Sequence, residues 1–287
     1  MSRLIKRLMV FFIGIPAIVG LVFFLPHYGH LALNIIVIIY SAVGAIEFSI
    51  MLEKKQLRIT KIEACIFGAL APVAAALTVS FNCPEWVVLL LIMAGASWVL
   101  LSRIFSSNEK METVTGQLAA GFSVLVYPGF FMYWLVKMSV WEHSGIIIFM
   151  FLMITLGSDA AAWLAGTLFG KNNRGIIPAS PNKSIAGFIG GVFGSIIVSG
   201  GTALIVPAVF IARIQSIPVL CQVIVLGIIT GIAAVLGDLA ESAIKRSCDC
   251  KDSGNLMLGR GGVLDSIDSI AFASPVFFLL FSLFFIA

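Results

Sequence analysis

Long apolar runs, separated by short polar segments, follow one another along almost the whole chain. A helix needs about 20 mostly apolar residues to cross the hydrocarbon core of a bilayer. Nine runs meet this length, near residues 8–26, 30–52, 61–81, 84–102, 114–136, 144–166, 186–210, 217–241 and 267–287. The pattern predicts an all-α polytopic membrane protein with about nine transmembrane helices.

The basic residues segregate with the segments that join these runs. If the N-terminus is placed in the cytoplasm, only Lys137 and Arg213 of the eighteen Lys and Arg residues fall outside. Cytoplasmic loops of membrane proteins are enriched in Lys and Arg, and one missed or added helix would scramble this segregation. We therefore predict a multi-pass protein of the cell inner (cytoplasmic) membrane, with its N-terminus in the cytoplasm and its C-terminus outside.

Composition supports a membrane protein and limits what the charge can mean. Hydrophobic residues make up 60% of the 287 residues and charged residues 11%, whereas a soluble domain carries about 25% charged residues. The net charge of +4 reflects the side of the membrane on which the cations lie. It therefore gives no sign of a nucleic-acid partner, and none is expected.

Ionisable residues within membrane spans are costly and mark candidate functional positions. Glu47 lies in the second predicted span and Asp159 in the sixth, and a polar stripe closes the eighth. The stripe has i, i+3, i+4, i+7 spacing, which places its members on one helix face: Asp238, Glu241, Ser242 and Lys245. Taken alone, it fits a salt-bridged helix end equally well.

A polar segment and the start of the last span follow this stripe. They contain further cations, a glycine-rich turn and two carboxylates three residues apart: Arg246, Lys251, Asp252, Gly259, Arg260, Gly261, Gly262, Asp265 and Asp268. Glycine-rich turns let backbone N–H groups approach phosphate, and carboxylates hold hard divalent cations. Each feature alone has a structural explanation, such as capping of a helix. Together, within about thirty residues, they predict a cytoplasmic site for a Mg²⁺-held polyphosphate.

A second polar cluster lies between the sixth and seventh predicted spans. It contains Asp159, Ser180-Pro181 and Lys183. For this segment alone a structural explanation is favoured, with the cations set by topology and Ser180-Pro181 forming a turn.

These segments together resemble the phosphatidate cytidylyltransferase family, also called CDP-diacylglycerol synthases. The family signature reads S-x-x-K-R-x4-K-D-x-G, then a P-G-H-G-G turn, then D-R-x-D. The matching positions are Ser242, Lys245, Arg246, Lys251, Asp252, Gly254, Gly259, Gly261, Gly262, Asp265 and Asp268. Asp159, Phe169-Gly170-Lys171 and Ser180-Pro181-x-Lys183 are similar to earlier family elements. The likeness covers the whole chain, with the specific motifs in its second half.

The chain departs from the family pattern at four places. Arg260 stands where the turn has His, Ser266 follows Asp265 in place of Arg, Ser158 precedes Asp159 in place of Asn, and Lys183 is followed by Ser184-Ile185-Ala186-Gly187 in place of T-W-E-G. Arg260 can bind phosphate in bidentate geometry but cannot act as a titrating group. The changes leave the predicted metal carboxylates and the Lys-Arg pair intact.

The resemblance implies an enzyme of phospholipid biosynthesis that converts CTP and phosphatidate to CDP-diacylglycerol and pyrophosphate. It implies Mg²⁺ as cofactor, with a second metal ion left open, held by Asp238, Asp265 and Asp268. Lys245, Arg246 and Lys251 would neutralise the phosphates, with Asp252 orienting one of them. Substrate-binding roles fall to Asp159, Ser180, Lys183, Ser242, Gly259, Arg260, Gly261 and Gly262.

We expect two functional regions and keep two alternative functions. Residues 1–143 would supply about five spans, and residues 144–287 about four spans with the signature at 237–269. The partners would be CTP, phosphatidate and the lipid bilayer, from which the lipid enters sideways, and a homodimer is left open. The alternatives are a CTP-dependent polyprenol or phytol kinase, and a transporter in which Asp159 and Asp238 relay protons or cations. The role of Glu47 is left open.

Overall fold

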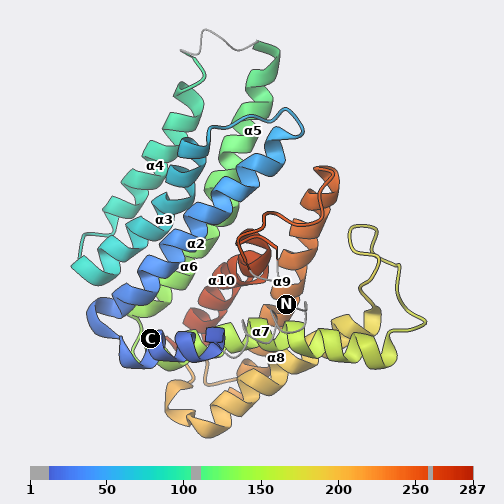
Figure 1. Cartoon of the computed structure of the whole chain (residues 1–287). Helices are drawn as coiled ribbons and strands as arrows, with labels where there is room; N and C mark the ends of the chain where they lie inside the picture. The colour runs from blue at the N-terminus through green and yellow to red at the C-terminus, as the bar shows by residue number, and fades with distance from the viewer. Residues whose placement is uncertain (1–12, 105–110, 258–260, 287) are drawn as a thin grey trace. The chain divides into compact units, whose positions relative to one another are not determined.

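The computed structural model describes residues 13–104, 111–257 and 261–286 (Figure 1). Within these ranges the chain is helical, without strands, and its only bridge pairs are Arg174 with Ser184 and Met257 with Gly261. The prediction of an all-α protein is therefore confirmed for the part of the chain that is described.

Seven helical segments are long and apolar enough to cross a membrane. They are α2 (His27–Glu53), α3 (Lys61–Phe81), the continuous segment Val114–Val140, α7 (Ser144–Phe169), α8 (Ile185–Ile205), α9 (Val219–Ser247) and α10 (Leu264–Phe285). Two of the nine predicted spans correspond to shorter apolar helices, Ile13–Phe24 and α4 (Trp86–Leu101). A multi-pass membrane protein is thus supported, while the count of nine and the orientation of the termini stay predictions.

Local sequence explains several helix boundaries and one irregular segment. Thr60 and Glu63 form a capping box at the start of α3, with the Glu63 N–H donating to Thr60 Oγ1 at 3.1 Å. Ser184 caps α8 by accepting from the Gly187 N–H at 3.0 Å. Pro128, which has no N–H to donate, lies in a π-helical turn, η3 (Leu125–Phe130), between α5 (Val114–Val124) and α6 (Phe131–Lys137).

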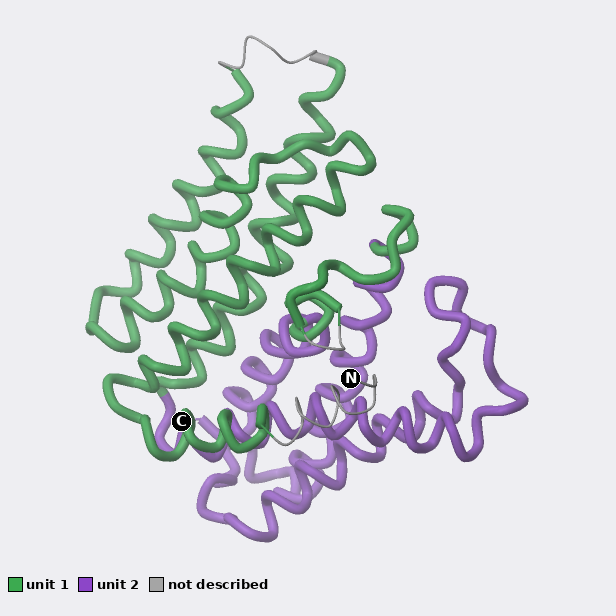
Figure 2. Tube along the Cα trace, viewed as in Figure 1, with its two compact units in different colours: residues 1–140, 245–267 green, residues 141–244, 268–287 purple. Residues whose placement is uncertain are grey.

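The chain divides into two compact units (Figure 2). Unit 1 comprises residues 1–140 and 245–267, and unit 2 comprises residues 141–244 and 268–287. Helices α9 and α10 each contribute residues to both units. The predicted division into 1–143 and 144–287 concerns which helices carry the reaction, which compactness does not test, and it stays a prediction.

Helices of unit 1 approach one another closely at small residues. A Cβ at Gly68 of α3 would lie 2.5 Å from the Ala45 Cβ and 2.7 Å from the Ser41 carbonyl oxygen of α2. The Ser41 hydroxyl donates to the Gly68 carbonyl oxygen at 2.6 Å. Small residues and interhelical hydrogen bonds of this kind drive helix association where lipid removes the hydrophobic contribution.

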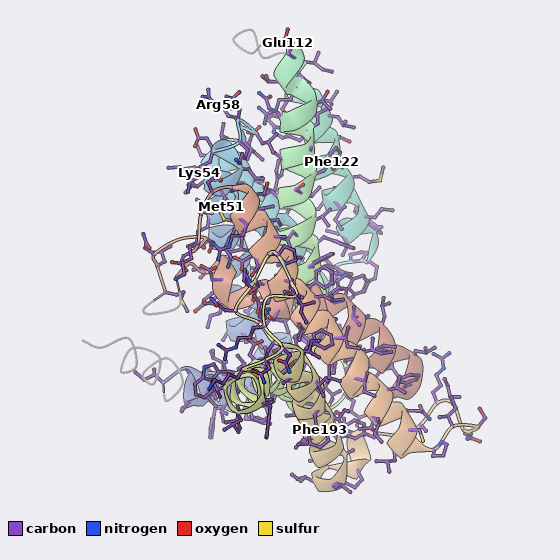
Figure 3. The ribbon with its side chains drawn as sticks, turned by 90° about the vertical axis from the view of Figure 1, so that its right-hand side faces the viewer. Met51, Lys54, Arg58, Glu112, Phe122 and Phe193 are labelled. Atoms are coloured by element: carbon purple, nitrogen blue, oxygen red, sulfur yellow. The ribbon has the colours of Figure 1, made fainter. Side chains whose placement is uncertain are left out.

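One end of unit 1 carries polar and basic residues. Lys54 and Arg58, which follow α2, lie toward the same end as Glu112, which precedes α5 (Figure 3). Lys55 forms a 2.6 Å ion pair with Asp249, in the segment that follows α9. Within unit 1, the turn after α2 and the segment after α9 therefore share one end, as expected for two loops on the same side of a membrane.

In unit 2, α7 and α8 pack through glycine and alanine. A Cβ at Gly194 of α8 would lie 2.6 Å from the Ala161 Cβ of α7. A different face of α8 carries exposed apolar side chains at four-residue spacing, of which Phe193 points outward in Figure 3: Ile185, Ile189, Phe193 and Ile197, each 47–63% exposed. One face of α8 thus suits helix packing and another suits contact with lipid.

Candidate active site

Predicted site residues and their polar neighbours form two groups among the described residues, one in each unit. The loop cluster, in unit 1, comprises Glu47, Lys245, Ser253, Gly262 and Asp265. The carboxylate cluster, in unit 2, comprises Asp159, Lys183, Asp238, Glu241 and Asp268. Sequence continuity links the clusters, because α9 carries both Asp238 and Lys245, and α10 carries both Asp265 and Asp268.

Asp265, in the first turn of α10, is surrounded by hydrogen-bond donors. Its Oδ1 accepts from the Lys245 ammonium. Its Oδ2 accepts from the Gly262 N–H at 2.7 Å, from the Ser253 N–H at 2.9 Å, and lies 3.0 Å from the Ser253 hydroxyl. The Asp265 and Lys245 side chains are only 7% and 12% exposed. Both oxygens of this carboxylate are thus engaged by the chain itself.

The glycine-rich turn reaches this carboxylate through its backbone. Gly261 has a φ of +100°, in the left-handed region that favours glycine, and a Cβ there would lie 2.5 Å from Asp265 Oδ2. The neighbouring Gly262 N–H points at the same oxygen. In the described turn, therefore, a backbone N–H approaches an internal carboxylate. The predicted phosphate cradle stays a prediction, and Gly259 and Arg260 lie outside the described residues.

Glu47 of α2 is buried against the same segment. Its side chain is 5% exposed, and Oε2 accepts from the Leu264 N–H at 2.9 Å and lies 3.1 Å from the Ser253 hydroxyl. The remaining predicted residues of unit 1, Arg246, Lys251 and Asp252, are exposed. Two carboxylates thus organise the segment, and exposed charges surround it.

In the carboxylate cluster, Asp238 pairs with a lysine from another element. Asp238 Oδ2 lies 2.5 Å from Lys183 Nζ, and the Ser242 hydroxyl lies 3.4 Å from Asp238 Oδ1. Lys183 is held in the segment between α7 and α8, where its N–H donates to the Ser180 carbonyl oxygen at 3.1 Å. The structure therefore brings together Lys183, Asp238 and Ser242, all three of which were predicted as site residues. Ser180, also predicted, lies in the backbone turn that carries Lys183.

Two buried carboxyl groups of this cluster, those of Asp268 and Glu241, face one another. Asp268 forms a side-chain hydrogen bond with Glu241 and lies close enough to Asp238 and Asp159 to interact electrostatically. Glu241 is fully buried and Asp268 is 7% exposed. A hydrogen bond between two carboxyl groups needs a proton on one of them, because an ionised carboxylate can only accept. Without that proton, or a cation in its place, two buried negative charges repel strongly.

The oxygen donors of the carboxylate cluster fit a hard divalent cation whose remaining coordination positions are filled by substrate. Among the residues described, no three His, Cys, Asp or Glu side chains are grouped tightly enough to hold a metal ion by themselves. Mg²⁺, however, is usually bound by one or two carboxylates together with substrate phosphates and water. Asp238 and Asp268 suit this mode, whereas the oxygens of Asp265 already accept from four donor groups. The metal roles of all three stay predictions.

Three residues of these clusters were not assigned a site role from the sequence. Glu241 was recognised in the polar stripe and Glu47 as a costly charge in a span, but neither received a function. Ser253 falls at a variable position of the signature, so nothing distinguished it. The sequence did contain one signal of a role for Glu47, namely its charge within an apolar span, because a buried carboxylate needs partners.

Comparison with known proteins places the chain in a family. The chain is 34% identical over 213 residues to the phosphatidate cytidylyltransferase of Staphylococcus haemolyticus, covering 74% of this chain and 76% of that protein. It is 30% identical over 191 residues to the phosphatidate cytidylyltransferase of Bacillus subtilis, covering 65% of this chain and 63% of that protein.

A relative without an assigned function is equally similar. The uncharacterized protein YnbB of Escherichia coli is 30% identical over 207 residues, which cover 70% of this chain and 65% of YnbB, slightly under two thirds of its length. The profile of the cytidylyltransferase family matches residues 5–284, almost the whole chain. As the signature predicted, the chain belongs to the cytidylyltransferase family.

Proposed function

We propose that this protein transfers the cytidylyl group of CTP to phosphatidate, giving CDP-diacylglycerol and pyrophosphate for phospholipid biosynthesis. The observation that carries the proposal is the family match over residues 5–284, together with two relatives named phosphatidate cytidylyltransferase. Family membership favours cytidylyl transfer over the lipid-kinase and transporter alternatives.

In this reaction a phosphate oxygen of phosphatidate attacks the α-phosphorus of CTP. The bond between the α-phosphorus and the bridging oxygen breaks, and pyrophosphate leaves with its electron pair. The attacking phosphate is already anionic at neutral pH, so no base is required. Catalysis then consists of alignment and neutralisation of charge.

The loop cluster suits neutralisation of phosphate charge. Lys245 is fixed by its ion pair with Asp265, while Arg246 and Lys251 are exposed and available to anionic substrates. We assign these three cations to the triphosphate and the lipid phosphate. Asp252 is also exposed, and its predicted role of orienting one cation is retained.

The carboxylate cluster suits Mg²⁺. We assign Asp238 and Asp268 as ligands, with Glu241 hydrogen-bonded to Asp268, and we retain Asp265 as a third candidate because the signature predicts it. Bound there, Mg²⁺ would neutralise charge on the triphosphate and stabilise the leaving pyrophosphate. Asp159 and Lys183 would flank the substrate.

We further propose that the reaction takes place at the cytoplasmic face of the inner membrane. The supporting observation is that the segment after α9 and the basic turn after α2 share one end of unit 1, joined by Lys55 and Asp249. Labelling of single cysteines introduced at Lys251 and at Glu142 with an impermeant maleimide, in right-side-out vesicles, should modify only position 142. The oligomeric state, with a homodimer left open, is measured by mass photometry in detergent.

Product analysis tests the function. Purified protein is incubated with phosphatidate, Mg²⁺ and CTP labelled either in the cytidine or in the γ-phosphate. The proposal expects cytidine label in the lipid and one pyrophosphate per CDP-lipid. Transfer of the γ label to lipid would indicate a kinase instead. No labelled lipid from folded protein, with either Mg²⁺ or Mn²⁺, would overturn the proposal.

A further inference from the structure

We propose that Glu47 is a positioning residue that anchors the signature segment, residues 251–257 and 261–264, to α2 and so holds Asp265 and Lys245 in place. Glu47 lies about two hundred residues before this segment in the chain. It is 5% exposed. A carboxylate buried inside a membrane span is expensive unless it has partners, and its partners identify its role.

The first partner is the N-terminus of α10. Leu264 is the first residue of this helix, and its N–H donates to Glu47 Oε2 at 2.9 Å. The first N–H groups of a helix have no partner within the helix and carry a positive partial charge. Glu47 therefore acts on α10 as a capping residue does, although it belongs to a different helix.

The second partner is Ser253, which joins Glu47 to Asp265. The Ser253 hydroxyl oxygen lies 3.1 Å from Glu47 Oε2 and 3.0 Å from Asp265 Oδ2. A hydroxyl has one hydrogen to donate, so the two carboxylates share it. The Asp265 N–H also donates to the Ser253 oxygen at 3.3 Å. Only the Ser253 side chain thus separates Glu47 from Asp265, the carboxylate that holds Lys245.

Two signature glycines make room for the Glu47 carboxylate. A Cβ built at Gly254 would collide with Glu47 Oε1, and a Cβ at Gly262 would collide with Glu47 Oε2. Neither residue has a positive φ, so backbone conformation does not require glycine at either position. Close approach of a buried side chain from α2 supplies a reason for glycine at both places.

The consequence for activity rests on the proposed function. A misplacement of about 1 Å at a catalytic group can cost about a hundredfold in rate. We expect Glu47→Ala to lower kcat about a hundredfold, with the Mg²⁺ concentration for half-maximal activity unchanged. Glu47→Gln keeps a carbonyl oxygen that can accept from Leu264 and Ser253, and should restore kcat to within about fivefold of wild type.

Ser41→Ala is a matched control on the same helix. Ser41 is buried and donates to the Gly68 and Pro128 carbonyl oxygens, away from the signature segment. Its removal should lower the melting temperature without lowering kcat of the folded protein. If Glu47→Ala keeps kcat within about threefold, or if Glu47→Gln fails as badly as Glu47→Ala, the positioning role is wrong.

Amide hydrogen exchange tests the anchor without any need for turnover. In detergent, Glu47→Ala should accelerate exchange of the Ser253, Gly262 and Leu264 N–H groups at least about tenfold, leaving α3 unchanged. Equal acceleration throughout unit 1 would show a general loss of stability and overturn the proposal. If wild-type protein makes no CDP-lipid, the proposed function fails while this measurement still decides the anchor.

Two other variants test the anchor if Glu47→Ala does not fold. Gly254→Ala introduces a Cβ against Glu47 Oε1 from the other side of the contact and should give the same local acceleration of exchange. Ser253→Ala cuts the link to Asp265, and its effect on kcat should not add to that of Gly254→Ala, since both changes disturb the same contact with Glu47. Unchanged exchange in Gly254→Ala, or full additivity, would contradict the proposal.

Discussion

The loop cluster and the carboxylate cluster both take residues from α9 and α10, yet their carboxylates are satisfied in opposite ways. In the loop cluster, Asp265 accepts from a lysine, two backbone N–H groups and a hydroxyl. In the carboxylate cluster, Asp268 forms its side-chain hydrogen bond with another carboxyl group, that of Glu241, and two further aspartates lie within electrostatic reach.

This difference separates two kinds of function. A carboxylate that already faces several donors has its charge compensated and serves to hold the groups around it. Carboxylates that are buried facing one another raise the free energy of the fold until a proton or a cation binds to them. The first arrangement suits positioning of Lys245, and the second suits transient binding of a metal with substrate.

The largest effect is expected for Asp268→Asn. Loss of a metal ligand should lower kcat/KM about a thousandfold, because a Lewis-acid contact is worth several kcal/mol. The melting temperature of the apo protein should hold or rise, since the variant relieves repulsion between Asp268 and Glu241. Radiolabelled CTP turnover and thermal unfolding check the two parts. A variant that keeps activity within tenfold would remove Asp268 from the metal site.

Asp265→Asn should show the reverse combination. Breaking a buried pair by removing one partner costs about 3–5 kcal/mol, so the melting temperature should fall together with a roughly hundredfold loss of kcat. The Mg²⁺ concentration for half-maximal activity should stay unchanged. If that concentration instead rises more than about tenfold while the melting temperature holds, Asp265 is a metal ligand, as the signature predicts.

Helix periodicity fixes which residues share a face, so several residues of both clusters could be predicted from the sequence. The polar stripe from Asp238 to Lys245 lies on α9, and Asp265 lies in the first turn of a helix, as expected. The apolar runs predicted every long helix that the structure describes. These features depend on residues within a few turns of one another.

Contacts across long chain separations could not be read from the sequence. Nothing near Glu47 indicates that its partners are Ser253 and Leu264, two hundred residues later. The pattern likewise gave no reason to expect residues 245–267 to group with residues 1–140 in one unit. The run 84–102 is apolar enough for a span, but its described helix, Trp86–Leu101, is shorter than composition alone predicts.

Lys183→Met tests the role of the ion pair in the carboxylate cluster. Lys183 and Asp238 form a 2.5 Å pair whose side chains are 29% and 32% exposed. Removing the lysine should lower kcat/KM for CTP about tenfold, the effect of losing one charge-assisted contact. It should also lower the Mg²⁺ concentration for half-maximal activity, because Asp238 loses a competing cation. Arg174→Met, in the same segment and bonded to the Gly166 carbonyl oxygen, is the control. An unchanged Mg²⁺ response would argue against Asp238 as a ligand.

The smallest effect is expected for Lys55→Met, which breaks a surface ion pair with Asp249, two residues before the segment that Glu47 anchors. A hydrogen bond that the Lys55 ammonium donates to Asp249 lowers the pKa of Asp249 and raises the pKa of Lys55. Because the folded-state pKa of Asp249 is lowered, the pair stabilises the fold above the ordinary aspartate range, about pH 4. That contribution is lost as the pH falls through the folded-state pKa.

The melting temperatures of wild type and Lys55→Met should therefore differ slightly at neutral pH and converge in acid. Activity should stay within about twofold, since exposed pairs contribute little. Thermal unfolding from pH 7 down to about pH 3 measures the convergence, with Lys54→Met as a control on the neighbouring residue. A tenfold loss of activity would show that the surface pair, rather than the buried Glu47, holds the signature segment. A difference in melting temperature that persists in acid would show that Lys55 stabilises the fold independently of the charge on Asp249.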